Sequence, residues 1–195
     1  MAEIKRTDGI WNAVFDKESK SKFDKNIAEV LKQVPIFEEL PNREIQNIAR
    51  IAYQRYYHEN EIIIHEGDAA AGMYIIMEGE VKVTKELEDG TVIYLTTLGD
   101  GAFFGDVGLL DNSPRTATVI AIRDSKIIGF FRPELLHLMD ADPKLASKVI
   151  FKLAQILAAR LRFTNNEMEK AQEEIDHLNA RLKEASDTSK ENLPV

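Results

Sequence analysis

Short β-type runs separated by glycine turns constrain this chain more than any other feature, and they fill the stretch from Tyr56 to Phe131. The runs are β-branched, or alternate apolar with polar side chains, at the roughly 8–12-residue spacing typical of sandwiches and barrels. The clearest are residues 61–65, 73–77, 81–84, 91–98, 116–121 and 126–131. No helical segments alternate with them, so the pattern predicts a small antiparallel barrel or sandwich rather than a parallel sheet.

Helical periodicity flanks this region on both sides. Residues 23–53 place apolar side chains on one helical face, with a break at Pro35 and a new start after Pro41. A short helix is expected from Pro133, and a long one from Asp142-Pro143, where proline suits the first helical turn. The predicted class is therefore α+β.

The long C-terminal helix carries a heptad pattern with charged flanks, which is typical of a coiled coil. Its a positions are Ala154, Leu161, Met168, Ile175 and Leu182, and its d positions are Ile150, Leu157, Thr164, Ala171, Leu178 and Ala185. Packing on the chain's own domain could account for residues 150–161. The very polar surroundings of residues 168–182 instead favour self-association, so we expect a homodimer through residues 150–185.

A glycine-rich segment, Phe104–Val119, has the outline of an anion site. Gly105 allows close backbone approach, the following helical turn offers N–H groups, and Arg115 supplies a forked cation. Asp106 would repel a bare phosphate but could accept a hydrogen bond from a hydroxyl. A ligand with both groups is a nucleotide.

The same residues resemble the phosphate-binding cassette of the cyclic nucleotide-binding domain family, whose pattern is Phe-Gly-Glu, a short apolar helix, then Arg-(Ala/Ser/Thr)-Ala-Thr-Val. Asp106 stands where the family usually has the glutamate that binds the ribose 2′-hydroxyl. The resemblance extends over about residues 27–166. It implies an eight-stranded antiparallel β-roll (a double-stranded β-helix or jelly roll) flanked by N-terminal helices and a long C-terminal coiled-coil helix.

The resemblance also implies roles for individual residues. Arg115 would pair with an exocyclic oxygen of the cyclic phosphate, Asp106 would bind the 2′-hydroxyl, and Thr116 would donate a hydroxyl or serve only as a strand residue. The remaining cassette positions expected to bind ligand are Phe104, Gly105, Val107, Gly108, Pro114 and Ala117.

Residues outside the cassette are expected to meet the base. Val83 and Leu95 align with apolar positions that pack the purine, although any β-roll would bury such residues. In the catabolite activator protein branch, hydroxyl groups on the dimer helix reach adenine. Thr164 and Asn165 occupy the matching positions here. A polar Thr164 could equally set the register of the coiled coil.

The expected function is a cyclic nucleotide sensor, with cyclic AMP favoured over cyclic GMP, that signals through its C-terminal helix to an unknown effector protein. The alternative is a scaffold whose pocket no longer binds nucleotide. An enzyme is not expected: the four histidines have no metal-type spacing, and no metal site is predicted. The chain ends without a helix-turn-helix, which disfavours DNA binding.

Composition limits the partners further. The formal net charge of −8 argues against nucleic acid and anionic membranes as partners. The absence of cysteine fits a reducing compartment, and the first residues lack a signal peptide's apolar core, so we expect a cytoplasmic protein. The expected division is an N-terminal arm (1–24, with Trp11 as anchor if it binds a partner), a nucleotide-binding domain (25–142), a dimerisation helix (143–185) and a disordered tail (186–195).

Overall fold

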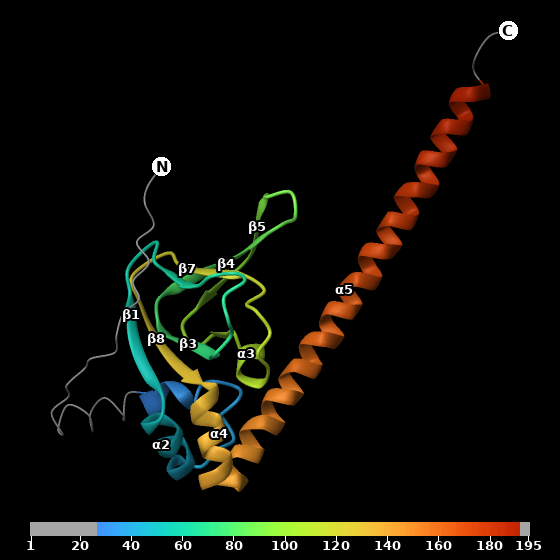
Figure 1. Ribbon diagram of the computed structural model, residues 1–195. Helices are drawn as coiled ribbons and strands as arrows, with labels where there is room; N and C mark the ends of the chain where they lie inside the picture. The colour runs from blue at the N-terminus through green and yellow to red at the C-terminus, as the bar shows by residue number, and fades with distance from the viewer. Residues whose placement is uncertain (1–26, 192–195) are drawn as a thin grey trace. The chain divides into compact units, whose positions relative to one another are not determined.

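The computed structural model describes the backbone of residues 27–191, as two compact units that divide after Ala146 (Figure 1). The expected N-terminal arm, residues 1–24, lies outside the described part of the chain. The first unit contains every strand of the described chain, and the second, from Ser147, is helical throughout its described length. The boundary between the two units thus lies within the first turn of the long helix, which starts at Pro143.

Eight strands form two four-stranded antiparallel sheets, which confirms the predicted roll. One sheet has the order β1-β8-β3-β6, made of Tyr53–Tyr57, Ser125–Phe131, Gly72–Glu78 and Phe103–Phe104. The other has the order β2-β7-β4-β5, made of Ile62–Ile64, Thr118–Ala121, Glu80–Glu86 and Val92–Gly99. The last strand, β8, lies between the first and the third, so strands distant in sequence are neighbours (Figure 1).

The apolar core lies between the sheets and continues under the helices. Buried residues from both sheets, among them Ile76, Val81 and Val119, form one cluster. Alternation along β4 explains this: Val81 and Val83 face the core, whereas Lys82 lies on the other face. At the helical end, Phe37 meets Phe130 edge to face, with ring centroids 6.3 Å apart.

The described first unit begins with helical residues 27–31, and its further helices are α2 (Asn42–Arg50), α3 (Val107–Leu110) and α4 (Arg132–Ala141), all close to where the sequence predicts them. α5 runs from Pro143 to Glu191 and begins at the expected proline. It continues past residue 185, where the sequence predicts a disordered tail. The backbone hydrogen bonds of the helix therefore outlast the heptad pattern.

Two strands differ from the sequence-based expectation. β1 starts at Tyr53, which helical periodicity assigns to the preceding helix, and β6 has only two residues, too few to show any period. A β-bulge in β5 is also unexpected: Val83 pairs with Thr96 and Thr84 with Tyr94, so Leu95 is the extra residue.

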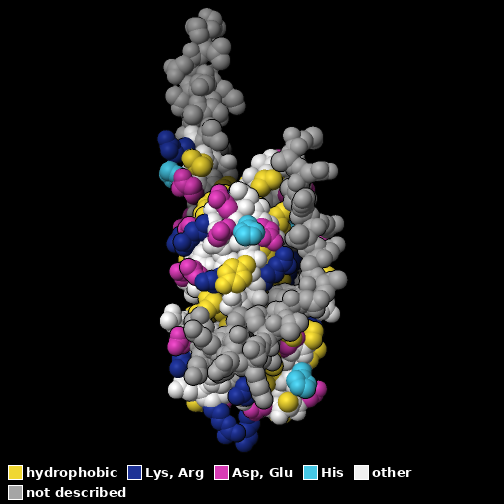
Figure 2. Space-filling view, turned by 90° about the vertical axis from the view of Figure 1, so that its left-hand side faces the viewer, with side chains coloured by type: hydrophobic (Ala, Val, Ile, Leu, Met, Phe, Trp, Pro, Cys, Tyr) yellow, Lys and Arg dark blue, Asp and Glu magenta, His cyan; other side chains and the backbone are white. Residues whose placement is uncertain are grey.

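The surface of the first unit mixes charges of both signs. On the face drawn in Figure 2, acidic and basic side chains lie side by side. Ion pairs join neighbouring segments, for example Arg55 with Glu61 at 3.1 Å. Among the helices of the described chain, none is both long and apolar enough to cross a bilayer.

A candidate anion pocket beside helix α3

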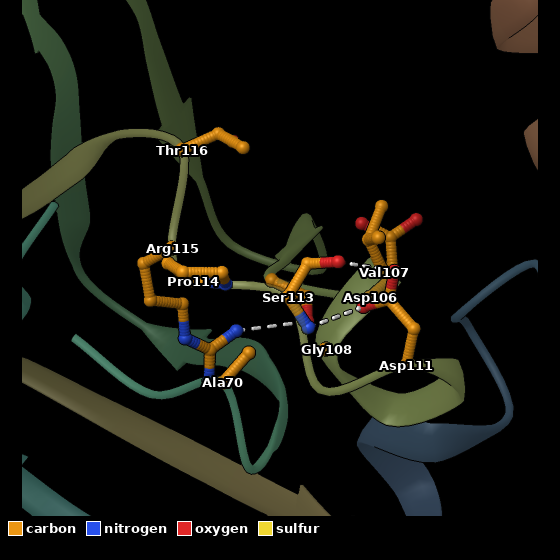
Figure 3. A pocket seen from close by; sticks show the side chains of 10 residues that line it. Ala70, Asp106, Val107, Gly108, Asp111, Ser113, Pro114, Arg115 and Thr116 are labelled. Carbon is orange, nitrogen blue, oxygen red and sulfur yellow. Dashed lines mark hydrogen bonds between the residues drawn. The ribbon is translucent and has the colours of Figure 1, made fainter. Parts of the chain in front are cut away.

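The glycine-rich segment folds around a small pocket between the end of β6 and the start of β7. The pocket has a volume of about 150 Å³ (Figure 3). Its lining residues are Ala70, Gly105, Asp106, Val107, Gly108, Asp111, Ser113, Pro114, Arg115 and Thr116. All but one come from the segment that the sequence singles out. Ala70 comes from the loop before β3.

Arg115 is the central side chain of the pocket. It is 9% exposed, and its guanidinium donates hydrogen bonds to the carbonyl oxygens of Gly105 (3.0 Å) and Gly72 (2.8 Å). The guanidinium carbon lies 5.6 Å from the centre of the Tyr74 ring, within reach of a cation–π interaction. In Figure 3 this side chain extends toward Ala70, whereas the side chain of Thr116 lies apart from it.

The backbone of Arg115 is fixed as well. Its N–H donates to the Asp68 carbonyl, and its own carbonyl accepts from the Gly67 N–H, each at 2.8 Å. The turn after β2 therefore holds the arginine on one side, while carbonyl groups hold its guanidinium on the other. Such a doubly fixed side chain is preorganised for a ligand.

The charge of Arg115 has no acidic counterion among residues 27–191. Within the described chain, no carboxylate lies at ion-pair distance from its guanidinium. Burial lowers the pKa of Arg115 from its ordinary value, because desolvation disfavours the charged form, but a guanidinium stays protonated at neutral pH. Two carbonyl bonds use two of its five N–H donors. The arrangement is suited to receive an anion.

Two glycines make room for this side chain. Gly105 has φ +70°, and a Cβ there would lie 2.7 Å from the Arg115 Nη1; a Cβ on Gly108 would lie 2.8 Å from the same atom and 2.6 Å from the Ala70 Cβ. The sequence predicts that these glycines let the backbone approach the ligand closely. In the structure, the space that a side chain would fill at both positions is occupied by the guanidinium of Arg115. The Gly108 N–H already donates to the Gly105 carbonyl at 3.1 Å.

Carboxylates line the other side of the pocket. Asp106 precedes α3 and is 4% exposed. Asp111, Ser113 and Ala70 are lining residues that the sequence does not predict, although the polar turn before Pro114 could have signalled the first two. The Ser113 hydroxyl and N–H both donate to the Asp111 carboxylate, at 2.8 and 3.2 Å, which fixes the loop beside the pocket (Figure 3).

The remaining predicted site residues lie outside the pocket lining. Phe104 stacks on Tyr74 with centroids 5.5 Å apart, and Ala117 is half-buried just beyond Thr116. Val83 is partly buried against the core, and Leu95 is 47% exposed on the bulge of β5. Thr164 and Asn165 are exposed residues of α5, in the second unit.

No group of three or more histidine, aspartate or glutamate side chains with the geometry of a metal site occurs within the described residues. The pocket's own chemistry is that of a cation facing a cavity, with a carboxylate close by. This chemistry would suit an organic anion that also carries hydroxyl groups.

Comparison with known proteins agrees with this geometry. The family model for the cyclic nucleotide-binding domain matches residues 54–142. The cyclic AMP receptor protein of Thermus thermophilus is 30% identical over 139 residues, which cover 71% of this chain and 62% of that protein. The type II regulatory subunit of cAMP-dependent protein kinase from Drosophila melanogaster is 41% identical over 93 residues, covering 48% of this chain and 24% of that protein.

A solved structure shows the same architecture. The cyclic nucleotide-binding domain from Methylobacillus flagellatus superposes with a TM-score of 0.66 at 26% identity, covering 75% of this chain and 82% of that one. Over residues 54–142, which include nearly all of the β-roll and the segment with the buried arginine, the chain is similar to the cyclic nucleotide-binding domain family. It spans less than two thirds of the length of either relative named above.

Proposed function

We propose that this protein is a regulatory sensor that binds a cyclic nucleotide and has no enzymatic activity of its own. The observation that carries the proposal is the buried guanidinium of Arg115, which faces the pocket with no carboxylate partner within the described chain. A buried charge without an opposite charge beside it is costly even when carbonyl groups accept its hydrogen bonds, and a ligand anion would offset that cost.

The ligand would be held by groups of different chemistry. Arg115 would donate to the cyclic phosphate, Asp106 would accept from the ribose 2′-hydroxyl, and Thr116 would donate a hydroxyl. Val83 and Leu95 would pack the base. The bulge at Leu95 supports this role, because a bulge redirects the side chain of the extra residue. Cyclic AMP is favoured over cyclic GMP, since both relatives named above are described by their relation to cyclic AMP.

The long helix would transmit the signal. In the single chain, large apolar residues at heptad positions are exposed, including Leu161 (62%), Met168 (66%) and Ile175 (51%). A second copy of α5 would bury them, so we propose a homodimer through residues 150–185. In it, Thr164 and Asn165 would contact the base, and an effector protein would sense the change. A cytoplasmic location fits the lack of cysteine.

Calorimetric titration with cyclic AMP and cyclic GMP tests the proposal. Arg115→Ala should lower the affinity about 100-fold, the scale expected when one partner of a desolvated charge pair is removed. Arg123→Ala is the matched control. Arg123 also donates to a carbonyl, that of Gly79 at 3.1 Å, but its side chain is 58% exposed and lies outside the pocket lining.

Arg115→Lys distinguishes a loss of nucleotide binding from a loss of folding. A lysine keeps the charge but not the fork that binds two carbonyls and an anion at once, so this variant should fold and bind weakly. If nucleotide-free protein binds neither ligand, the sensor proposal is wrong. The scaffold alternative, with Asp106 as a degenerate position, would then take its place.

A further inference from the structure

Lys85 is a cation beside the pocket that no sequence motif singles out. It occupies the end of β4, two residues beyond Val83, so the alternation of the strand places both side chains on the same face. The Lys85 ammonium donates to the Thr116 carbonyl at 3.2 Å and pairs with the Glu66 carboxylate at 3.6 Å. It therefore contacts the residue that follows Arg115.

Glu66 extends this contact into a small network. Its carboxylate accepts a hydrogen bond from the Glu86 N–H at 3.0 Å, and its own N–H donates to the Thr118 hydroxyl at 3.0 Å. The end of β4, the turn after β2 and the start of β7 are thus tied together. The pocket's arginine lies just before this last segment, next to Thr116.

We propose that Lys85 is a positioning residue of the anion pocket, one that sets the affinity for the ligand by holding Thr116 and the turn at Glu66 in place. The inference rests on the proposed nucleotide binding. Lys85 would not touch the phosphate: its ammonium is engaged by the Thr116 carbonyl and Glu66. Its effect would pass through Thr116 to the adjoining Arg115.

Partial burial makes the contact energetically relevant. The side chains of Lys85 and Glu66 are 42% and 25% exposed, so solvent screens the pair less than it screens a fully exposed one. A carbonyl bond to an ammonium is also stronger than one between neutral groups. Loss of both contacts should weaken nucleotide binding by about fivefold, the upper range for partly exposed pairs.

Lys82 offers a matched control on the same strand. It lies on the opposite face of β4, and no hydrogen bond or ion pair involves its side chain in the described structure. Lys82→Met and Lys85→Met change the net charge equally, so both variants share the effect of net charge on an anionic ligand, whereas the direct Coulomb effect of each lysine depends on its distance from the pocket. Methionine keeps most of the aliphatic length of lysine. In nucleotide-free protein, where no anionic ligand is present, the contacts with Thr116 and Glu66 distinguish the two variants.

Two measurements test the inference. In calorimetry with cyclic AMP and cyclic GMP, Lys85→Met should bind about fivefold more weakly than Lys82→Met, and Lys85→Arg should restore most of the affinity. In nucleotide-free protein, amide exchange at Gly67, Glu86 and Arg115 should be several-fold faster in Lys85→Met than in Lys82→Met. A purely structural role would lower global stability without a selective change at these amides.

The outcomes separate this inference from the proposed function. Equal affinities and equal exchange in the two methionine variants would overturn the role of Lys85, whether or not nucleotide binds. If the unsubstituted protein binds neither nucleotide, the proposed function is wrong and the role of Lys85 as a determinant of affinity falls with it. Selective amide exchange would then still identify Lys85 as the residue that holds the turn.

Discussion

Substitution of Gly105 by alanine tests whether Arg115 is packed as the structure shows. Two costs are expected. Alanine at φ +70° costs about 1 kcal/mol relative to glycine. Its Cβ would also lie 2.7 Å from the Arg115 Nη1, so the guanidinium must move and lose its 3.0 Å bond to the Gly105 carbonyl, at about a further 1 kcal/mol. We expect the free energy of unfolding to fall by about 2 kcal/mol in total.

Two other glycines isolate these contributions. Gly90, in the turn between β4 and β5, has φ +81°, and a Cβ added there would meet no atom within 4 Å, so Gly90→Ala should cost only the conformational term. At Gly108, where φ is not positive, Gly108→Ala has close contacts with Arg115 and with the Ala70 Cβ but no backbone strain. The three variants therefore separate backbone strain from close steric contact at the pocket.

Urea unfolding followed by near-ultraviolet circular dichroism is the appropriate assay, because all five tyrosines lie in β1, β3 and β5 and report on the roll. Nucleotide titration of the same variants gives the second readout. Gly105→Ala and Gly108→Ala should weaken binding, and Gly90→Ala should not. If Gly105→Ala and Gly90→Ala lose the same stability and keep the same affinity, the guanidinium does not pack against Gly105.

Three further predictions concern other parts of the chain. Burial raises the pKa of Tyr57 to about 12, so its contribution to stability is complete below pH 10 and is lost as the pH rises toward 12; Tyr57→Phe should reduce this alkaline loss in urea titrations at several pH values. Ser125 is 2% exposed, and its hydroxyl accepts a hydrogen bond from the Glu80 N–H at 3.2 Å and donates one to the Arg123 carbonyl at 2.8 Å. Because both groups would lose their partner, Ser125→Ala should lower the free energy of unfolding by about 2 kcal/mol. Ser113→Ala is the control, because Ser113 is exposed; equal losses of unfolding free energy in the two variants would contradict the stabilising role of the buried Ser125 hydroxyl. On α5, Met168→Lys should shift sedimentation from dimer toward monomer, whereas an unchanged sedimentation coefficient would contradict the proposed coiled coil.

The sequence predicts the roll well because its signals are local. The runs around Ile62–Ile64 and Ser125–Phe131 carry β-branched and aromatic residues, and Pro143 marks the start of the long helix. β1 escapes prediction because Tyr53–Tyr57 follows a helix directly and is stabilised by pairing with β8, far along the chain. A two-residue strand such as β6 has no periodicity from which to predict it.

The site, too, contains residues that local sequence signals predict and others that depend on contacts between distant segments. Arg115, Gly105 and Asp106 could be found from their spacing alone, and the structure places all three at one pocket. Ala70 and the Tyr74 ring could not, because both reach Arg115 through pairing of distant segments: Ala69 bridges to Pro114, and Tyr74 lies in β3, which pairs with β6 and β8. The physical role of Gly105 was also out of reach, since the atom it accommodates belongs to a side chain ten residues away.

The central place of β8 in its sheet has a consequence for synthesis on the ribosome. β1 and β3 both pair with β8, and neither pairs with the other. Until Ser125–Phe131 has emerged, the nascent chain therefore exposes tyrosine-rich β1 and apolar β3 with unsatisfied edges, the kind of intermediate that chaperones protect from aggregation. Translation pauses before this strand would prolong that exposure, whereas pauses within α5 would come after the roll has closed.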